Sequence, residues 1–307
     1  MRYVPLFCII KADLDGAPPC ARRKEGRKVE KRRIEGQNFG QERALYGSRD
    51  LHVINCSFDG IEDGERALKE SRNVRVENVF CNLRYPFWHD EGLELQNCEM
   101  TEKCRAALWY STDISISDCT MNGVKALREC ANVHMERCTV NSTEFGWSTR
   151  GLRMKECTAA GEYFLLRSED VDFREVTFQG KYSFQYVKNA VLENCTLDTK
   201  DAFWHAENVT LRNCTVKGEY LAWYAKGLTM IDCEIIGTQP FCYCEDLKLI
   251  NCQMEGADLA FEKSTVEAEI TTPVISIKNP TEGRITVPAV GELIMDAPDA
   301  KCEIVVG

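Results

Sequence analysis

The sequence predicts an all-β fold: a single-stranded right-handed parallel β-helix of about 14 coils of 19 residues, with three short strands per coil. The first observation behind this prediction is a phrase that recurs at a constant interval, without insertions, between Cys138 and Cys252. The second is apolar alternation inside each repeat, and the third is a set of turn residues in constant register. We call the central position of the repeat the anchor column, and its most regular members are Cys138, Cys157, Val176, Cys195, Cys214, Cys233 and Cys252.

Each repeat contains three short apolar runs. The first has apolar residues five and three positions before the anchor, the period-two spacing of a strand with one buried face. The second run comprises the anchor and the residue two positions after it. The third run lies eight positions after the anchor, at Leu68, Phe87, Leu108, Leu127, Leu165, Phe184, Phe203 and Phe241. We expect each run to form a strand that contributes side chains to the core.

Turn residues separate these runs at fixed positions. Gly, Asn and Asp accept a positive φ at low cost, so a column of them marks a sharp bend. Such residues stand six positions before the anchor, as in Asn189 and Asn208, and one position before it, as in Asn194 and Asn213. Glycines recur four positions after it. We expect stacked Asn amides to hydrogen-bond between coils. A leucine-rich repeat would need a long convex segment, for which three bends in so short a repeat leave no room.

The anchor column extends in both directions from the regular part. Its further members are Cys119, Cys98, Val79, Cys56 and Gln37 upstream, and Thr271 and Val290 downstream. Residues 1–33 do not carry the repeat and include a basic run, which we interpret as an extension or cap rather than an arm for an anionic partner. Residues 34–307 form the predicted solenoid, and residues 263–307 are expected to supply its last coils and a C-terminal cap.

The cysteines and the net charge limit the partners and the compartment. Nine of the seventeen cysteines occupy the anchor column, where side chains that point the same way stay too far apart for disulfides. Buried free thiols suit a reducing compartment, so we expect a cytoplasmic protein. We expect no metal site, because four ligands would have to converge on one point, and we expect no cofactor. A net charge of −10 argues against a nucleic-acid partner, and no long apolar run indicates a membrane span. The oligomeric state stays open.

Aromatic and charged residues alternate on one expected outer face. Nine positions after the anchor stand all five tryptophans, and the next position mixes Tyr and His with charged residues. Flat rings beside carboxylates suit sugar stacking and acid–base chemistry, although ring ladders also stabilise a parallel sheet by themselves. The charged residues five positions after the anchor are either a ladder that fixes register or part of a polar groove.

Several phrases resemble a known family. Tyr85-Pro-Phe-Trp88, Lys200-Asp-Ala-Phe-Trp204 and Ile277-Lys-Asn-Pro280 resemble a bacterial domain family of unknown function with a pectate-lyase-like right-handed parallel β-helix. The resemblance covers roughly residues 34–290. It implies the fold, but it brings no activity and therefore no catalytic residues.

The most favoured function is a ligand-binding solenoid, with a carbohydrate as one candidate ligand and a protein as the other. We expect binding at Lys200, Trp204, His205, Tyr220, Trp223, Tyr243, Asp258 and Glu262. One alternative is a polysaccharide hydrolase or lyase in which Asp201 and Glu219, on adjacent coils, act as acid and base. Another alternative is a non-catalytic scaffold for protein partners. Whether the protein is an enzyme stays open.

Overall fold

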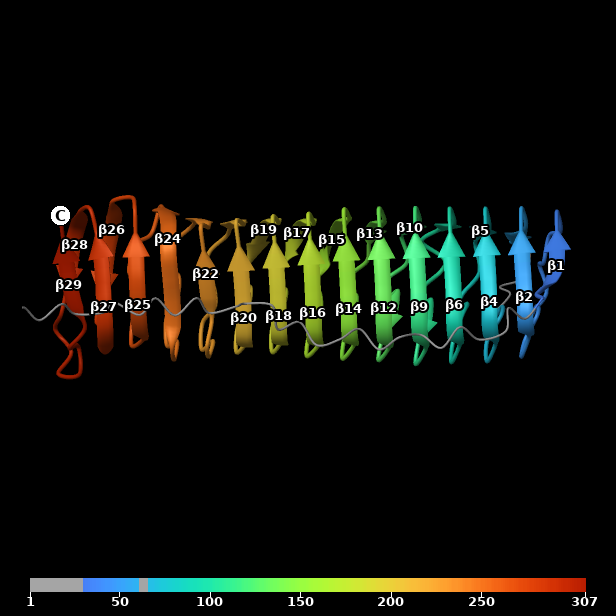
Figure 1. Cartoon of the computed structure of the whole chain (residues 1–307), viewed down its shortest axis with the longest axis horizontal. Helices are drawn as coiled ribbons and strands as arrows, with labels where there is room; N and C mark the ends of the chain where they lie inside the picture. The colour runs from blue at the N-terminus through green and yellow to red at the C-terminus, as the bar shows by residue number, and fades with distance from the viewer. Residues whose placement is uncertain (1–29, 61–65) are drawn as a thin grey trace, which may run out of the picture. The chain divides into compact units, whose positions relative to one another are not determined.

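The computed structural model describes residues 30–60 and 66–307, and these residues form β-strands and turns without a helix. Figure 1 shows the long strands side by side in chain order along the solenoid. Their pairing is parallel, and in the regular part each residue pairs with its equivalent in the next repeat, as in Val133↔Leu152. The predicted parallel β-solenoid of about 14 turns is therefore confirmed. The predicted N-terminal extension lies mainly outside the described residues, and β1 begins at Arg32.

Each coil has three sides. The first side carries the long strands β1 (Arg32–Glu35), β2 (Arg49–Ile54), β4 (Arg72–Glu77), β6 (Glu91–Gln96), β9 (Thr112–Ser117), β12 (Ala131–Glu136), β14 (Arg150–Lys155), β16 (Glu169–Arg174), β18 (Lys188–Glu193), β20 (Glu207–Arg212), β22 (Thr229–Ile231), β24 (Leu247–Glu255), β25 (Thr265–Ile270), β27 (Glu282–Val287) and β29 (Glu303–Val306).

The second side carries shorter strands, and β24 is long enough to serve both sides. These strands are β3 (Ser57–Phe58), β5 (Phe80–Cys81), β7 (Glu99–Met100), β10 (Thr120–Met121), β13 (Thr139–Asn141), β15 (Thr158–Glu162), β17 (Thr177–Lys181), β19 (Thr196–Lys200), β21 (Thr215–Lys217) and β23 (Glu234–Ile236). Strands are sparse on the third side, where they are β8 (Leu108–Trp109), β11 (Leu127–Arg128), β26 (Val274–Lys278) and β28 (Val290–Ile294).

The third side differs in local geometry from the strand that its apolar run predicts. Every second residue there has a positive φ, as at Tyr182 (57°), Phe184 (58°) and Tyr186 (56°). The Phe184 N–H donates to the preceding coil at Phe164 O (2.7 Å), whereas the Tyr186 N–H donates to the following coil at Trp204 O (2.8 Å). The segment is thus hydrogen-bonded between coils without being a regular strand, and its apolar residues still enter the core.

One continuous core fills the solenoid. In β18, Ala190 and Leu192 point inward in strict alternation, and anchor Cys195 follows at the corner. The third side contributes rings: Phe184 and Phe203 are both buried and stack at 4.8 Å between centroids. Since each coil contacts only its neighbours, this repeated layer stabilises the chain coil by coil.

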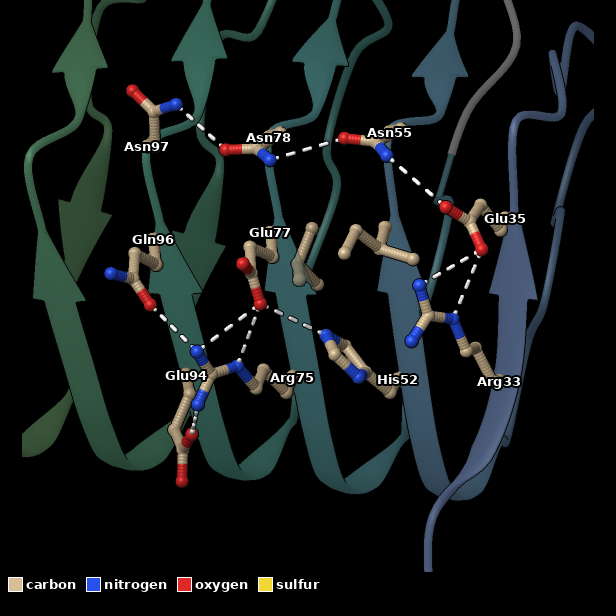
Figure 2. Close-up of polar contacts among 12 residues, drawn as sticks. Arg33, Glu35, His52, Asn55, Arg75, Glu77, Asn78, Glu94, Gln96 and Asn97 are labelled. Carbon is tan, nitrogen blue, oxygen red and sulfur yellow. Dashed lines mark hydrogen bonds and ion pairs between the residues drawn. The ribbon is translucent and has the colours of Figure 1, made fainter.

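The predicted corners are confirmed. Asn189 and Asn194, at the two bends that flank β18, have φ values of 54° and 55°. Side-chain amides also bond between coils: Asn97 donates to Asn78 (2.7 Å), and Asn78 donates to Asn55 (3.1 Å). Figure 2 shows these amides in a row above the strands.

Charged side chains pair across coils on the outer face of the first side (Figure 2). The Glu77 carboxylate lies 3.1 Å from both His52 Nε2 and Arg75 Nη2, and Arg75 donates to Gln96 Oε1 at 2.7 Å. These contacts join β2, β4 and β6, so they favour the register in which the strands pair.

The repeat shortens near the C-terminus, and two predicted anchors are wrong. A register shift in β24 pairs Cys252 with Ile270, so Thr271 is not the anchor. Ala268 then pairs with Ile285, whereas the regular step would have reached Val287, so Val290 is displaced as well. Val290 instead begins β28 on the third side, where it pairs with Val274 of β26.

The nine anchor cysteines are buried and free, as expected. Outside the anchor column, burial raises the pKa of the Cys130 thiol to about 11 and that of Cys244 to about 12, so both stay protonated near neutral pH. Protonated, buried thiols are poor nucleophiles. Within residues 30–60 and 66–307, no group of three or more His, Cys, Asp or Glu side chains is placed to hold a metal ion.

Candidate functional site

Four aromatic side chains form a row on consecutive coils, ten positions after the anchor, in which exposed tyrosines alternate with half-buried rings. We call Tyr186, His205, Tyr224 and Tyr243 the ring row. Successive ring centroids are 4.8, 4.9 and 4.8 Å apart, and the ring planes are within 12° of parallel. Tyr186 and Tyr224 keep 42% and 41% of their surface exposed. Because each ring covers the face of its neighbour, the row presents ring edges, with phenol hydroxyls and an imidazole, to solvent.

Trp204 and Trp223 lie beside the ring row, and their indole N–H groups donate hydrogen bonds to the backbone. Trp204 Nε1 donates to Tyr220 O at 2.7 Å, and Trp223 Nε1 donates to Gln239 O at 2.8 Å. The two indole rings stack at 5.4 Å with an angle of 5°, so they cover one another's faces. This geometry supports the ladder interpretation of the tryptophan column and leaves little free ring face for a sugar.

At another coil an arginine takes the place of a ring in the tryptophan column. The Arg128 guanidinium lies 5.1 Å from the centroid of the Trp109 ring and 5.3 Å from that of Trp147. It therefore stands between two indoles, in the arrangement that a cation–π interaction favours.

The charged residues five positions after the anchor pair between coils. Lys181 Nζ lies 3.0 Å from Glu162, and Lys200 Nζ lies 2.8 Å from Glu219. The hydrogen bond with Glu219 raises the pKa of Lys200. These pairs agree with the charge-ladder interpretation, and the pair with Lys200 engages the Glu219 carboxylate that the enzyme alternative would use.

Asp201 is the unusual acid of this region. The residue is 7% exposed, and within the described residues no hydrogen bond or ion pair reaches its carboxylate. Burial raises the pKa of Asp201; nearby Lys200 opposes this effect and Glu219 adds to it. A buried carboxyl with a perturbed pKa beside exposed polar groups is a recognised sign of a functional position.

The structure brings the predicted site residues onto successive coils but not into one pocket. Lys200, Asp201, Glu219 and Tyr220 form one cluster on two coils, because the Asp201 N–H bonds to Glu219 O at 3.0 Å. Asp258 and Glu262 lie farther along and have partners of their own. Asp258 accepts from Ser276 Oγ at 2.6 Å, and Glu262 pairs with Lys278 at 3.0 Å.

Shallow grooves lie on other parts of the solenoid. One of about 280 Å³ is lined by β24, β25 and β27, including Lys248, Glu267 and Arg284. Another of about 270 Å³ crosses β12, β14 and β16, with Arg153 at its middle strand. Neither groove contains a predicted site residue.

The sequence interpretation missed two features. Tyr186 and Tyr224 complete the ring row but were not selected, although the ten-after spacing contains the signal. Asp90 is 2% exposed and stands in a column, eight positions before the anchor, that otherwise holds small side chains such as Ser71, Ser111 and Cys130. That column was not recognised as an inward-facing one.

Several solved structures are similar to this chain. The A-module of the mannuronan C-5 epimerase AlgE6 of Azotobacter vinelandii has 9% identity and a TM-score of 0.39, with coverage of 90% of this chain and 88% of that chain. PfbA, a surface adhesin of Streptococcus pneumoniae, has 10% identity and a TM-score of 0.37, with coverage of 78% and 70%. The tailspike of the Escherichia coli bacteriophage HK620, crystallised with a hexasaccharide, has 8% identity and a TM-score of 0.34, with coverage of 85% and 71%.

No curated protein matches the chain. In the part of the chain that the structure describes, no helix is long and apolar enough to cross a membrane. A family model described as "Protein of unknown function (DUF3737)" matches residues 32–305, which is most of the solenoid. The chain therefore belongs to the DUF3737 family.

Proposed function

We propose that this protein binds a hydroxyl-rich linear polymer, a carbohydrate chain, along the ring row. The observation that carries the proposal is the repetition of one stacked, at least partly exposed ring per coil over Tyr186, His205, Tyr224 and Tyr243. Phenol hydroxyls both donate and accept hydrogen bonds, and an imidazole can do either. A polymer that runs parallel to the coil stack would meet an equivalent polar group at each coil.

The two ends of the ring row carry different charged groups, so the proposed binding surface is not the same at both ends. The Arg167 guanidinium lies 5.8 Å from the centroid of the Tyr186 ring at one end. At the other end Glu262 follows Tyr243 in the same column and pairs with Lys278. A chain with polar groups along its length therefore finds a cation at the Tyr186 end and an ion pair at the other.

Replacing Tyr224 with phenylalanine should weaken binding without disturbing the stack, because only the hydroxyl is lost. One hydrogen bond corresponds to roughly a three- to tenfold loss of affinity. Tryptophan fluorescence can measure this loss against hexasaccharides of galacturonate, mannuronate and glucose, since Trp223 lies 5.9 Å from Tyr243, centroid to centroid.

The matched control is Tyr110→Phe. Tyr110 is 41% exposed and stacks on His89 at 5.0 Å in the same column, but it lies outside the ring row. Equal effects of the two substitutions, or no effect of Tyr224→Phe, would contradict the proposal. A flat response of the wild-type protein to all three sugars would favour the scaffold alternative.

The second candidate is a polysaccharide hydrolase or lyase that uses Asp201 and Glu219. The raised pKa of Asp201 favours it, because a general acid is most effective when its pKa is shifted toward the working pH. If the candidate holds, Asp201→Asn and Glu219→Gln should each lower turnover of a bound hexasaccharide by about a hundredfold or more. Unchanged product formation by both variants, followed by chromatography, would exclude it.

We also propose a cytoplasmic location. The support is chemical: the fifteen described cysteines are all free and buried, a state that a reducing compartment preserves. Cell fractionation with an antibody against the protein tests this proposal, and recovery outside the cytoplasm would refute it.

A further inference from the structure

A second aromatic row runs beside the first, six positions after the anchor, and it skips one ring. Tyr163 and Tyr182 stack at 5.0 Å with an angle of 22°. The next coil places Asp201 at the equivalent position, and the coil after that returns to Tyr220. In the part of the chain that the structure describes, the Tyr182 ring therefore has no ring neighbour on the Asp201 side.

The residue that replaces the ring is an acid whose carboxylate has no partner in the described part of the chain. Asp201 is 7% exposed, yet no hydrogen bond or ion pair within the described residues reaches its carboxylate. Neither Asp201 oxygen is among the buried side-chain atoms that lack a hydrogen-bond partner, so the carboxylate reaches solvent and is open to a ligand from outside.

The lysine of the preceding coil turns away from Asp201. Lys181 Nζ reaches back to Glu162, at 3.0 Å, one coil farther from Asp201. The same ammonium lies 5.6 Å from the centroid of the Tyr182 ring. Because Lys181 is held by Glu162, its charge is directed to the Tyr163 side of that ring rather than to the Asp201 side.

The lysine beside Asp201 leans in the opposite direction. Lys200 Nζ reaches forward to Glu219 in the following coil, at 2.8 Å, and lies 5.1 Å from the centroid of the Tyr220 ring. The outer side of Asp201 is thus bordered by the Tyr182 ring on one side and by an ammonium group on the other.

We propose that this position holds one pyranose unit of a carbohydrate, with its ring against Tyr182 and its hydroxyls bonded to Asp201 and Lys200. A pyranose has an apolar ring face and a polar edge, and the position offers a ring face beside an acceptor and a donor. The ligand class rests on the proposed function, but the position is separate from the ring row. It makes Asp201 an anchoring residue for one sugar unit.

The variant Asp201→Tyr tests the proposal by completing the row. Tyr163, Tyr182 and Tyr220 have φ values of 54°, 57° and 58°, and Asp201 has 54°, so the backbone already suits tyrosine there. The new ring would occupy the place of the pyranose and stack on Tyr182. We expect at least about a tenfold loss of hexasaccharide affinity and no decrease in melting temperature.

Gln239→Tyr is the matched control, because Gln239 stands in the same column two coils farther along with a φ of 49°. This substitution should leave the affinity unchanged. A loss in Asp201→Tyr but not in Gln239→Tyr supports the proposal. Equal affinity of Asp201→Tyr and the wild-type protein overturns it, and the binding function along the ring row then stands alone.

A second measurement separates this proposal from the proposed function. Methyl galacturonoside and methyl glucoside, added at high concentration to protein with ¹³C-labelled tyrosine, should shift the ring signal of Tyr182 and leave that of Tyr110 in place. If these monosaccharides shift Tyr182 while no hexasaccharide binds more tightly than they do, the pyranose position stands and the ring-row function fails. If no sugar of either size perturbs the protein, both fail.

Discussion

Replacing Gly218 with alanine is expected to destabilise the protein by about 3–5 kcal/mol, because both the contact and the backbone angle forbid a side chain. A Cβ at this position would lie 1.7 Å from the carbonyl oxygen of Thr199 in the preceding coil. The φ of Gly218 is 153°, a value that residues with a side chain rarely adopt. Since the clash is with backbone, neither coil can relieve it by rotating a side chain. Denaturant unfolding measures the loss.

Gly256→Ala is the control for backbone strain alone. Gly256 also has a positive φ (67°), but its nearest neighbour would be Gly237 N at 3.9 Å, an ordinary contact. We expect a cost of about 1–2 kcal/mol there. If the two variants lose the same stability, close approach between coils is not the reason for the glycine at 218.

The damage from Gly218→Ala should also be local. Each coil contacts only its neighbours, so hydrogen-exchange protection should fall in β19, β21 and β23 and stay high in β4 and β6. The affected coils carry His205 and Tyr224 of the ring row. Weakened hexasaccharide binding should therefore accompany the loss of protection.

The corners of the solenoid illustrate what the sequence could predict. Asn189 and Asn194 have positive φ values, and the preference of asparagine for such values is intrinsic. The third side shows the opposite case. Tyr182, Phe184 and Tyr186 also have positive φ, which nothing in aromatic side chains predicts. Hydrogen bonds to the coils on both sides impose it, so the apolar run was interpreted as a strand.

The candidate site also combines features that the sequence could predict with features that it could not. The mixture of rings and charges ten positions after the anchor was sufficient to place Tyr243 and His205 on the surface. It could not show that the rings cover each other's faces, because that depends on the spacing between coils. Nor could it show that the Asp201 carboxylate pairs with neither neighbouring lysine, since this depends on the directions in which Lys181 and Lys200 lean.

Replacing Asp90 with serine is expected to stabilise the protein by about 1–3 kcal/mol near pH 8. Asp90 Oδ1 accepts the Ser71 N–H at 2.8 Å, but Oδ2 is buried without a partner. Serine already fills the equivalent place one coil later. There the Ser111 hydroxyl accepts the Asp90 N–H at 3.0 Å and donates to Phe87 O at 2.7 Å.

The stability gained by Asp90→Ser should depend on pH, and the burial of the Asp90 carboxyl determines the direction of that dependence. Burial raises the pKa of Asp90 well above its usual value of 3.8, so the folded chain favours the neutral carboxyl. Below about pH 4 the group is neutral in both states and costs little. As the pH rises, the unfolded chain ionises first, and the native state loses stability until the folded pKa is passed. Asp90→Ser should remove this loss, so the difference between variant and wild type should grow from pH 4 upward.

Asp113→Asn controls for the change in net charge. The Asp113 carboxylate is at an exposed corner, accepts the Asn132 side-chain amide at 3.0 Å, and occupies a column in which asparagine is common. Removing that charge should leave the slope of stability against pH nearly unchanged between pH 4 and 8. If the two variants respond alike, the effect belongs to the net charge of −10 rather than to the buried carboxyl. A slope that disappears only in Asp90→Ser would identify one inward-facing acid as a main source of the pH dependence of this solenoid.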